Sequence, residues 1–258
     1  MKRFASLLLV LMMLFGGFAR SEEVGFATPE DALCAWLTAL KYQDFSRAAS
    51  CFATESIADH FTEEVLTNGR SLPVLSDGGS QVVLLIPHEA YRELNVANLH
   101  AHAVAVTMYA ASALAATPDT EFFEHIMLYN LYNRYYPEER VTETLALLET
   151  TDFQQLESLV IHGSLDMETY LLLTGCQAKE LSAEIDRIAA EIDRIVSAYG
   201  AQDARPVMIE FEVAGYGRCM VAMYALQYQN KWYLLGPSRL LAGMSIGFQG
   251  STGIILPK

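Results

Sequence analysis

The sequence predicts an α+β fold, in which N-terminal helices pack on a curved antiparallel sheet and a large helical insertion interrupts the strands. Three observations predict it: a capped amphipathic segment that begins at Thr28, helical spacing of apolar residues over most of 120–200, and alternating segments with short turns after Pro206. Apolar spacing of three and four residues is typical of helices, and strict alternation is typical of half-buried strands. Both kinds of element are therefore expected.

The first nineteen residues predict a secretory signal peptide. Lys2 and Arg3 precede an apolar run and a small-residue exit that ends at Ala19, which is the three-part pattern of such peptides. A membrane-spanning helix needs about 17 to 25 apolar residues, and the run 4–19 is at or below the short end of that range. We expect cleavage after Ala19 and a secreted or extracytoplasmic location; the alternative is a retained N-terminal anchor.

The exported chain is expected to be strongly acidic. Without Lys2 and Arg3 it carries 15 basic and 31 acidic side chains, a formal charge of −16. Nucleic-acid affinity comes from clustered Lys and Arg, and the basic residues here are few and scattered, so no nucleic-acid partner is expected. Strong binding to an anionic membrane surface is not expected either, because the surface would repel the domain.

The first helix is expected to begin beside Thr28, whose side chain can cap it. Pro29 suits the first turn, and the acidic residues that follow favour the positive end of a helix. The apolar positions of this segment fall at helical spacing: Leu33, Trp36, Leu37 and Leu40.

Two further short helices are expected after a turn at 42–43. Asp44 starts the segment 45–52, and a third helix is expected over 55–66. The stretch 68–79 is rich in Gly, Ser, Asp and Pro, which predicts a loop.

Two strands are expected next. The apolar run 81–86 ends at Pro87 and is consistent with a buried strand. Small and larger residues alternate over 96–109, which favours a strand. The alanine content of 96–109 leaves a helix as the alternative.

The stretch 120–200 is expected to be helical, with breaks at 137, 150–152, 163–164 and 175. Within it a six-residue sequence that begins at Ala183 recurs seven residues later, and this places Ile residues on one seam: Ile185, Ile188, Ile192 and Ile195. Two heptads are too few for a coiled coil. An amphipathic helix lying on the domain is the favoured interpretation, and a self-association zipper is the alternative.

An antiparallel meander of three strands is expected after Pro206. Its segments are 207–213, 219–228 and 232–235, with a tight turn at 229–231. The tail 240–258 is expected to be mostly irregular. The expected organisation is therefore a signal peptide, first helices and strands, a helical insertion and completing strands, with boundaries at 1–19, 20–118, 119–204 and 205–258.

This order of elements resembles the ketosteroid isomerase-like, or nuclear transport factor two-like, cone fold of exported bacterial proteins. The resemblance lies in the Pro-Glu-Asp start with an early Trp36, the separated strands, and the final hairpin Gln-Tyr-Gln-Asn-Lys-Trp-Tyr-Leu. It covers 28–66 and 207–235, together with 81–109, and 120–200 departs from it. The resemblance implies a curved sheet around the opening helices, with a cone-shaped pocket.

The two closely spaced histidines are His100 and His102. In a strand both rings would point to one face and could supply half of a metal site. No Asp, Glu or Cys lies nearby in sequence to supply the rest. Two histidines on a polar sheet face are therefore favoured, and no metal or cofactor is expected.

Four cysteines in an exported chain permit two disulfides. Cys34 and Cys51 lie almost symmetrically about the turn at 42–43, so an antiparallel helical hairpin would bring them opposite each other. Such a bridge would contribute about 3 kcal/mol by the chain-entropy estimate. Free buried thiols are the competing interpretation.

The expected function is that of a non-catalytic binding or scaffolding module for an unknown small ligand or protein. Serine nucleophile elbows, phosphate-binding glycine loops and His-Glu-x-x-His motifs are absent from the sequence. The alternative is an enzyme with a carboxylate of raised pKa in the cone, where Glu210 or Glu212 could serve. These alternate with Ile209, Phe211 and Val213, so the glutamates are expected to face solvent.

Overall fold

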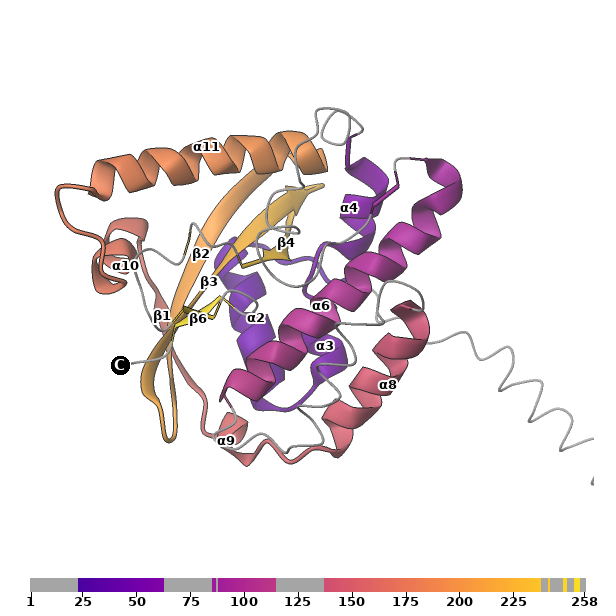
Figure 1. Ribbon diagram of the computed structural model, residues 1–258, viewed down its shortest axis with the longest axis horizontal. Coiled ribbons are helices and arrows are strands. Elements are labelled where there is room, and N and C mark those ends of the chain that lie inside the picture. The colour runs from indigo at the N-terminus through magenta and orange to yellow at the C-terminus, as the bar shows by residue number, and fades with distance from the viewer. Residues whose placement is uncertain are drawn as a thin grey trace, which may run out of the picture.

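The computed structural model places a curved antiparallel sheet between two helical layers (Figure 1). It describes residues 23–62, 85–86, 88–114, 137–237, 241, 248–249 and 253–255. α2, α3, α6 and α8 lie on one side of the sheet, and α10 and α11 lie on the other. The predicted α+β class is confirmed.

The described helices are α2 (Pro29–Lys41), α3 (Phe45–Ala49), α4 (Thr54–His60), α6 (Arg92–Leu114), α8 (Pro137–Thr150), α9 (Gln154–Glu157), α10 (Met167–Leu173) and α11 (Leu181–Tyr199), with a 3-10 turn η1 (Glu89–Tyr91) before α6. The strands are β1 (Val160–Ser164), β2 (Asp203–Val213), β3 (Gly217–Tyr228), β4 (Lys231–Gly236), β5 (Phe248–Gln249) and β6 (Ile254–Ile255). None of the described helices is long and apolar enough to cross a bilayer.

The sheet has the order β1-β2-β3-β6-β5, and β4 also pairs with β3. β2 and β3 pair from Asp203↔Gln227 to Val213↔Gly217. β3 and β4 are joined by a two-residue turn at Gln229 and Asn230, which have φ of 49° and 61°. Positive φ at both central residues matches the twist of a hairpin. The predicted three-stranded meander is confirmed.

The second edge of β3 is shared by two strands. β4 pairs with its C-terminal part, from Tyr224 to Tyr228. β6 pairs with its N-terminal part, where Ile255 lies opposite Met220 and Ile254 opposite Val221. The short strand β6 therefore pairs with the part of this edge of β3 that β4 leaves unpaired.

The two opening helices begin as the sequence predicts. Thr28 Oγ1 accepts a hydrogen bond from the N–H of Asp31 at 3.1 Å, which caps α2. Asp44 Oδ1 accepts from the N–H of Arg47 at 2.9 Å and caps α3. The third helix, α4, ends at His60, within the expected range 55–66.

The strand favoured over 96–109 is wrong, because these residues lie in the 23-residue helix α6. Fourteen of its residues are buried, on almost every side. A helix surrounded by protein has no polar stripe, so alternation of small and larger residues carries no information about its period.

The helical stretch also contains a strand that the sequence did not predict. β1 lies at 160–164, where a break between helices was expected, and pairs antiparallel with β2. At the expected break at 137, Pro137 opens α8, a position in the first turn that suits proline. The expected breaks at 150–152 and 175 separate helices as predicted.

The repeat near residue 183 forms α11, which packs its isoleucines on the sheet. Ile188 and Ile195 are buried, whereas Ile185 at the start of the seam is 38% exposed. Gly200 ends the helix with a φ of 60°, a left-handed conformation that suits glycine. The amphipathic interpretation is confirmed.

Side chains of the sheet alternate between two cores. Ile209, Phe211 and Val213 of β2 face the core that contains Trp36 of α2. Met208 of the same strand faces the other core, under α11. Several expectations lie outside the described residues: the signal peptide, the loop 68–79 and residues 81–84 of the expected strand 81–86.

Candidate binding pocket between α4 and α6

A pocket of about 310 Å³ lies where the end of α4 meets the start of α6. Its lining residues come from both helices and from the turn before α6: Ala58, Asp59, Phe61, His88, Glu89, Arg92 and Asn95. This volume is at the small end of the usual range for ligand sites. The pocket therefore has room for a small organic group.

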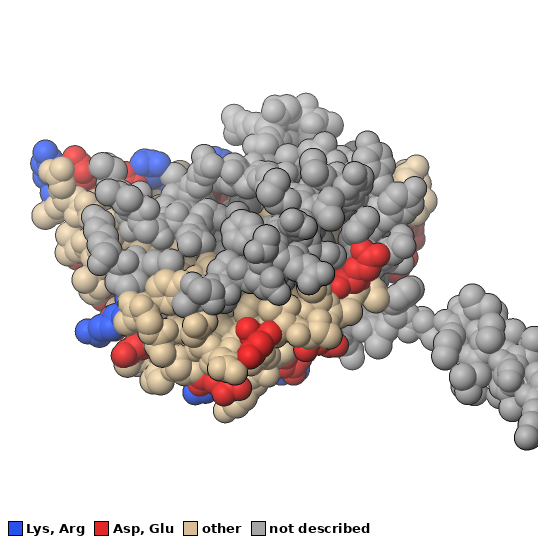
Figure 2. Space-filling model, turned by 60° about the horizontal axis from the view of Figure 1, so that its bottom comes forward, with Lys and Arg blue, Asp and Glu red and all other residues tan. Residues whose placement is uncertain are grey.

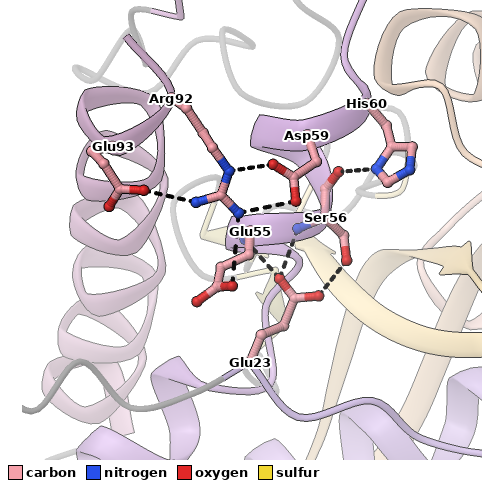
Figure 3. A network of polar contacts seen from close by, with 7 residues as sticks. All are labelled: Glu23, Glu55, Ser56, Asp59, His60, Arg92 and Glu93. Atoms are coloured by element: carbon pink, nitrogen blue, oxygen red, sulfur yellow. Dashed lines mark hydrogen bonds and ion pairs between the residues drawn. The ribbon is translucent and has the colours of Figure 1, made fainter. Parts of the chain in front are cut away.

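Arg92 forms the charged wall of the pocket (Figure 3). Its Nη2 donates to Asp59 Oδ2 at 3.0 Å, its Nε donates to Asp59 Oδ1, and its Nη1 donates to Glu93 Oε1 at 2.8 Å. Glu55 Oε2 lies 3.9 Å from Nη2. Hydrogen bonds to Asp59 and Glu93 raise the pKa of Arg92 above its usual value, so the guanidinium is a permanent cation.

Glu23 fixes the start of α4, where its carboxylate faces Glu55 and Ser56 (Figure 3). The residue at the cap position, Ala53, has no side chain that can accept a hydrogen bond. Glu23 Oε2 instead accepts from the N–H groups of Glu55 at 2.7 Å and Ser56 at 3.0 Å, and Oε1 accepts from the Ser56 hydroxyl at 2.5 Å. Burial raises the pKa of Glu23, although these hydrogen bonds act in the opposite direction.

The polar residues before and within α6 are held by local bonds. His88 Nδ1 lies 3.1 Å from the N–H of Ala90, so Nδ1 accepts, and a neutral ring carries its proton on Nε2. Asn95 is 1% exposed. It accepts from the N–H of Ile86 at 2.9 Å and donates to the carbonyl of Ile86 at 2.8 Å. These bonds fix 85–86 against the first turns of α6.

Carboxylates outnumber cations around the pocket. Asp59 and Glu89 line it, while Glu55 and Glu93 contact Arg92 from outside. On the face shown in Figure 2, red acidic side chains likewise form patches, and blue basic ones lie toward the rim. The site is thus acidic, with its guanidinium already surrounded by carboxylates.

The helix α6 separates the two histidines that the sequence singled out. Positions two apart on a helix point in nearly opposite directions, so His100 and His102 cannot chelate one ion as they would on a strand. No group of three His, Cys, Asp or Glu suited to a metal occurs among the described residues. The Nε2 of His102 is buried without a hydrogen-bond partner in the described part of the chain, and burial lowers its pKa to about 4.

The structure holds Cys34 and Cys51 as free thiols, like Cys176 and Cys219. Cys34 is half-buried on α2, and burial together with Asp31 and Glu30 raises its pKa. Cys51 is fully buried and its Sγ donates to the carbonyl of Arg47 at 3.4 Å. Burial raises the pKa of Cys51 to about 12, so this sulfur packs as a small apolar group.

The two glutamates of β2 lie away from the core that faces α2. Glu212 is exposed and lies 3.4 Å from His162 Nε2 of β1. Glu210 accepts from Arg218 Nη2 of β3 at 2.6 Å. Neither glutamate points into the core beside Trp36, where a cone pocket would lie.

A buried carboxyl that the sequence did not single out lies on the opposite face of the sheet. Glu191 of α11 is 2% exposed. Its Oε2 accepts a hydrogen bond from the hydroxyl of Tyr224 of β3 at 2.5 Å. Glu191 lies three residues after Ile188 and four before Ile195, both buried, so helical spacing places it on the same face of α11 and is the sequence signal that could have identified it.

The chain has low similarity to known proteins. No family model and no curated protein matches the chain. Among solved structures, a cystatin-like protein from Ruminococcus gnavus ATCC 29149 is similar at 14% identity and a TM-score of 0.39. The alignment covers 89% of this chain and 44% of that one, so this chain spans less than half the length of that protein.

Proposed function

We propose that this chain is an exported, non-catalytic binding module of the cone-fold type that takes its ligand in the pocket between α4 and α6. One observation carries the proposal. Side chains of α2 occupy the side of the sheet where a cone pocket would lie, whereas a concave surface with convergent polar groups lies between α4 and α6.

Among the described residues, the face of the sheet that α2 covers, here called the inner face, is closely packed. Trp36, Leu33 and Leu37 of α2 are fully buried, as are Ile209 and Phe211 of β2. Where these described side chains pack closely, a substrate could enter beside the sheet only if the core were rebuilt. A binding role on the outer surface needs no such change.

Fragment screening by NMR tests the binding role. Uniformly labelled protein is titrated with small neutral, cationic and anionic compounds, and the amide shifts of Asp59, His88 and Asn95 are followed. We expect at least one chemical class to shift these amides in a saturable way. Saturable shifts confined to the inner face near Trp36 would overturn the proposal, as would their absence at the pocket for every class.

Export is the second part of the proposal, and it rests on the signal-peptide pattern of residues 1–19. Expression of the full chain in a bacterium with a secretory pathway should give extracytoplasmic protein that begins at Arg20. Mass spectrometry of the N-terminus measures this. Retention of Met1 on the folded protein contradicts it.

An enzyme is the second candidate, and the buried pair Glu191 and Tyr224 is the observation that favours it. A carboxyl beside a hydroxyl in an apolar setting is a usual acid–base arrangement. Isomerisation of a 3-oxo-Δ5-steroid, followed by ultraviolet absorbance, tests the reaction that the resemblance implies. Turnover that is lost in Glu191→Gln would replace the binding proposal.

A further inference from the structure

We propose that the pocket between α4 and α6 accepts a cation, an ammonium or guanidinium group on an aliphatic stem. This inference rests on the proposed function, because it names the chemical class of ligand for that same pocket. The site has three features that suit a cation: a negative charge, an arginine already bound by carboxylates, and an apolar wall.

The charge around the pocket is negative. Among the described residues, Asp59 and Glu89 line it, and Glu55 and Glu93 lie against the guanidinium of Arg92. The side chains of Asp59 and Glu55 are 40% and 41% exposed, so both carboxylates are half open to an incoming group. Like-signed carboxylates in a concave surface raise the local concentration of cations.

Arg92 is poorly placed to attract an anion. Its Nε and Nη2 both donate to Asp59, and its Nη1 donates to Glu93. These bonds use three of the five guanidinium N–H groups, and an anionic ligand that approached the other two would also meet the carboxylates around Arg92. Arg92 therefore neutralises and orients Asp59, and the excess negative charge stays with the pocket.

The wall beside the carboxylates suits an aliphatic stem. Ala58 and Phe61 line the pocket. Tyr91, which is 45% exposed, lies with its ring centroid 5.9 Å from that of the lining residue His88. Alkyl stems with a charged tip pack along such surfaces, and aromatic rings attract the tip. The volume of about 310 Å³ admits one such group.

The experiment compares three probes that share one stem: pentylammonium, 1-pentanol and pentanoate. Each is titrated by NMR into the full-length chain at low ionic strength, and the amides of Asp59, His88 and Asn95 report binding. We expect pentylammonium to bind about tenfold more tightly than pentanoate, with pentanol between them. Raising the salt concentration should weaken pentylammonium alone, because salt screens exposed charges.

Two variants distinguish the effect of a carboxylate in the pocket from the effect of the net charge of the protein. Glu89→Gln removes a lining carboxylate and should weaken pentylammonium about two- to fivefold, while pentanol is unaffected. Glu168→Gln on α10 removes an exposed carboxylate far from the pocket and should change nothing. Equal weakening by both variants would show a general charge effect and overturn the site.

The source of the cation is resolved by a second pair of probes. Binding of N-acetyl-lysinamide, but not N-acetyl-norleucinamide, at the affinity of pentylammonium supports a lysine side chain of a partner. Binding of pentylammonium alone supports a free amine. If pentanoate or pentanol binds the pocket as well as pentylammonium does, the cation inference is wrong and the binding role stands. If no compound of any class binds there, the binding role itself fails.

Discussion

The indole Nε1 of Trp36 donates a hydrogen bond to Oγ1 of Thr107 at 3.2 Å, and both side chains are fully buried. Thr107 in turn donates to the carbonyl of Ala103 at 2.9 Å. These two hydrogen bonds join α2, whose side chains pack on one face of the sheet, to α6, whose first turns line the pocket. The position of the pocket therefore depends on a polar contact inside an apolar core.

Thr107→Val should test the strength of that contact. Valine keeps the volume but leaves the Trp36 N–H buried without its acceptor, so we expect a loss of about 1 to 3 kcal/mol in the free energy of unfolding. Urea unfolding measures it. Thr150→Val, at an exposed position of α8, is the matched control and should cost far less. Equal effects would show that the Trp36 bond contributes little.

Replacement of Glu23 should loosen the start of α4. Glu23→Ala leaves the N–H groups of Glu55 and Ser56 without their acceptor and should cost about 1 to 2 kcal/mol, by analogy with lost helix caps. Glu23→Gln keeps one acceptor oxygen and should retain most of the stability. Hydrogen exchange at Glu55 and Ser56 localises the effect, and unchanged protection in Glu23→Ala would contradict the capping role.

The same residue predicts a pH dependence. Burial raises the pKa of Glu23 above 4.5 in the folded protein, so the folded state binds more protons than the unfolded state above that pH. Stability should therefore fall as the pH rises from 4.5 through the folded pKa. Glu23→Gln should lack this component, which unfolding curves between pH 4.5 and 8 would show. A slope identical to that of the parent protein rules the contribution out.

His102 should make the fold sensitive to acid in the opposite sense. Its pKa is lowered from 6.5 to about 4 by burial, so the unfolded state binds more protons in that window. Stability should be lost as the pH falls from 6.5 through 4, by at most about 3 kcal/mol. His102→Leu should flatten this loss in urea unfolding, whereas His162→Gln at an exposed position of β1 should leave it unchanged.

The pair Glu191 and Tyr224 should be energetically coupled. Tyr224→Phe removes the hydroxyl donor and should cost about 1 to 3 kcal/mol. In a double-mutant cycle with Glu191→Ala, the two losses should not add, because the residues share one bond. Tyr42→Phe, at a side chain that is 72% exposed, is the control. Additive losses would show that the contact does not bind α11 to the sheet.

Thiol labelling separates the cysteines by burial. Half-buried Cys34 should react with iodoacetamide in the native protein. Cys51 and Cys219 should react only after unfolding, because burial raises their pKa values to about 12 and 11. Peptide mass mapping reads both outcomes. A bridge between Cys34 and Cys51 would leave both unlabelled and lower the mass by two hydrogens.

The elements that could be predicted from sequence are those with local signals. Thr28 and Asp44 cap the helices that follow them, and the alternation in β2 separates Glu210 and Glu212 from the apolar core. These patterns depend on neighbours within a few residues. The meander could be placed for the same reason, since Gln229 and Asn230 supply the turn.

The elements that could not be predicted are set by distant contacts. α6 is buried almost all round, so its sequence from Val96 to Tyr109 has no polar stripe to show its period. β1 is short, and its pairing with β2 becomes visible only in three dimensions. The pocket joins Asp59 and Arg92, which are 33 positions apart. The acidic residues at the start of α6 hint at a charged site, but they do not identify a partner.

By pairing with β3, the C-terminal strand β6 covers backbone groups of β3 that would otherwise be exposed. Met220 and Val221 would otherwise present free backbone groups beside β4, and an open strand edge recruits strands from other molecules. A recombinant version cut before Ile254 would therefore tend to aggregate even though every helix is intact. Purification tags are better placed ahead of Glu23, where they do not disturb the pairing of β6 with β3.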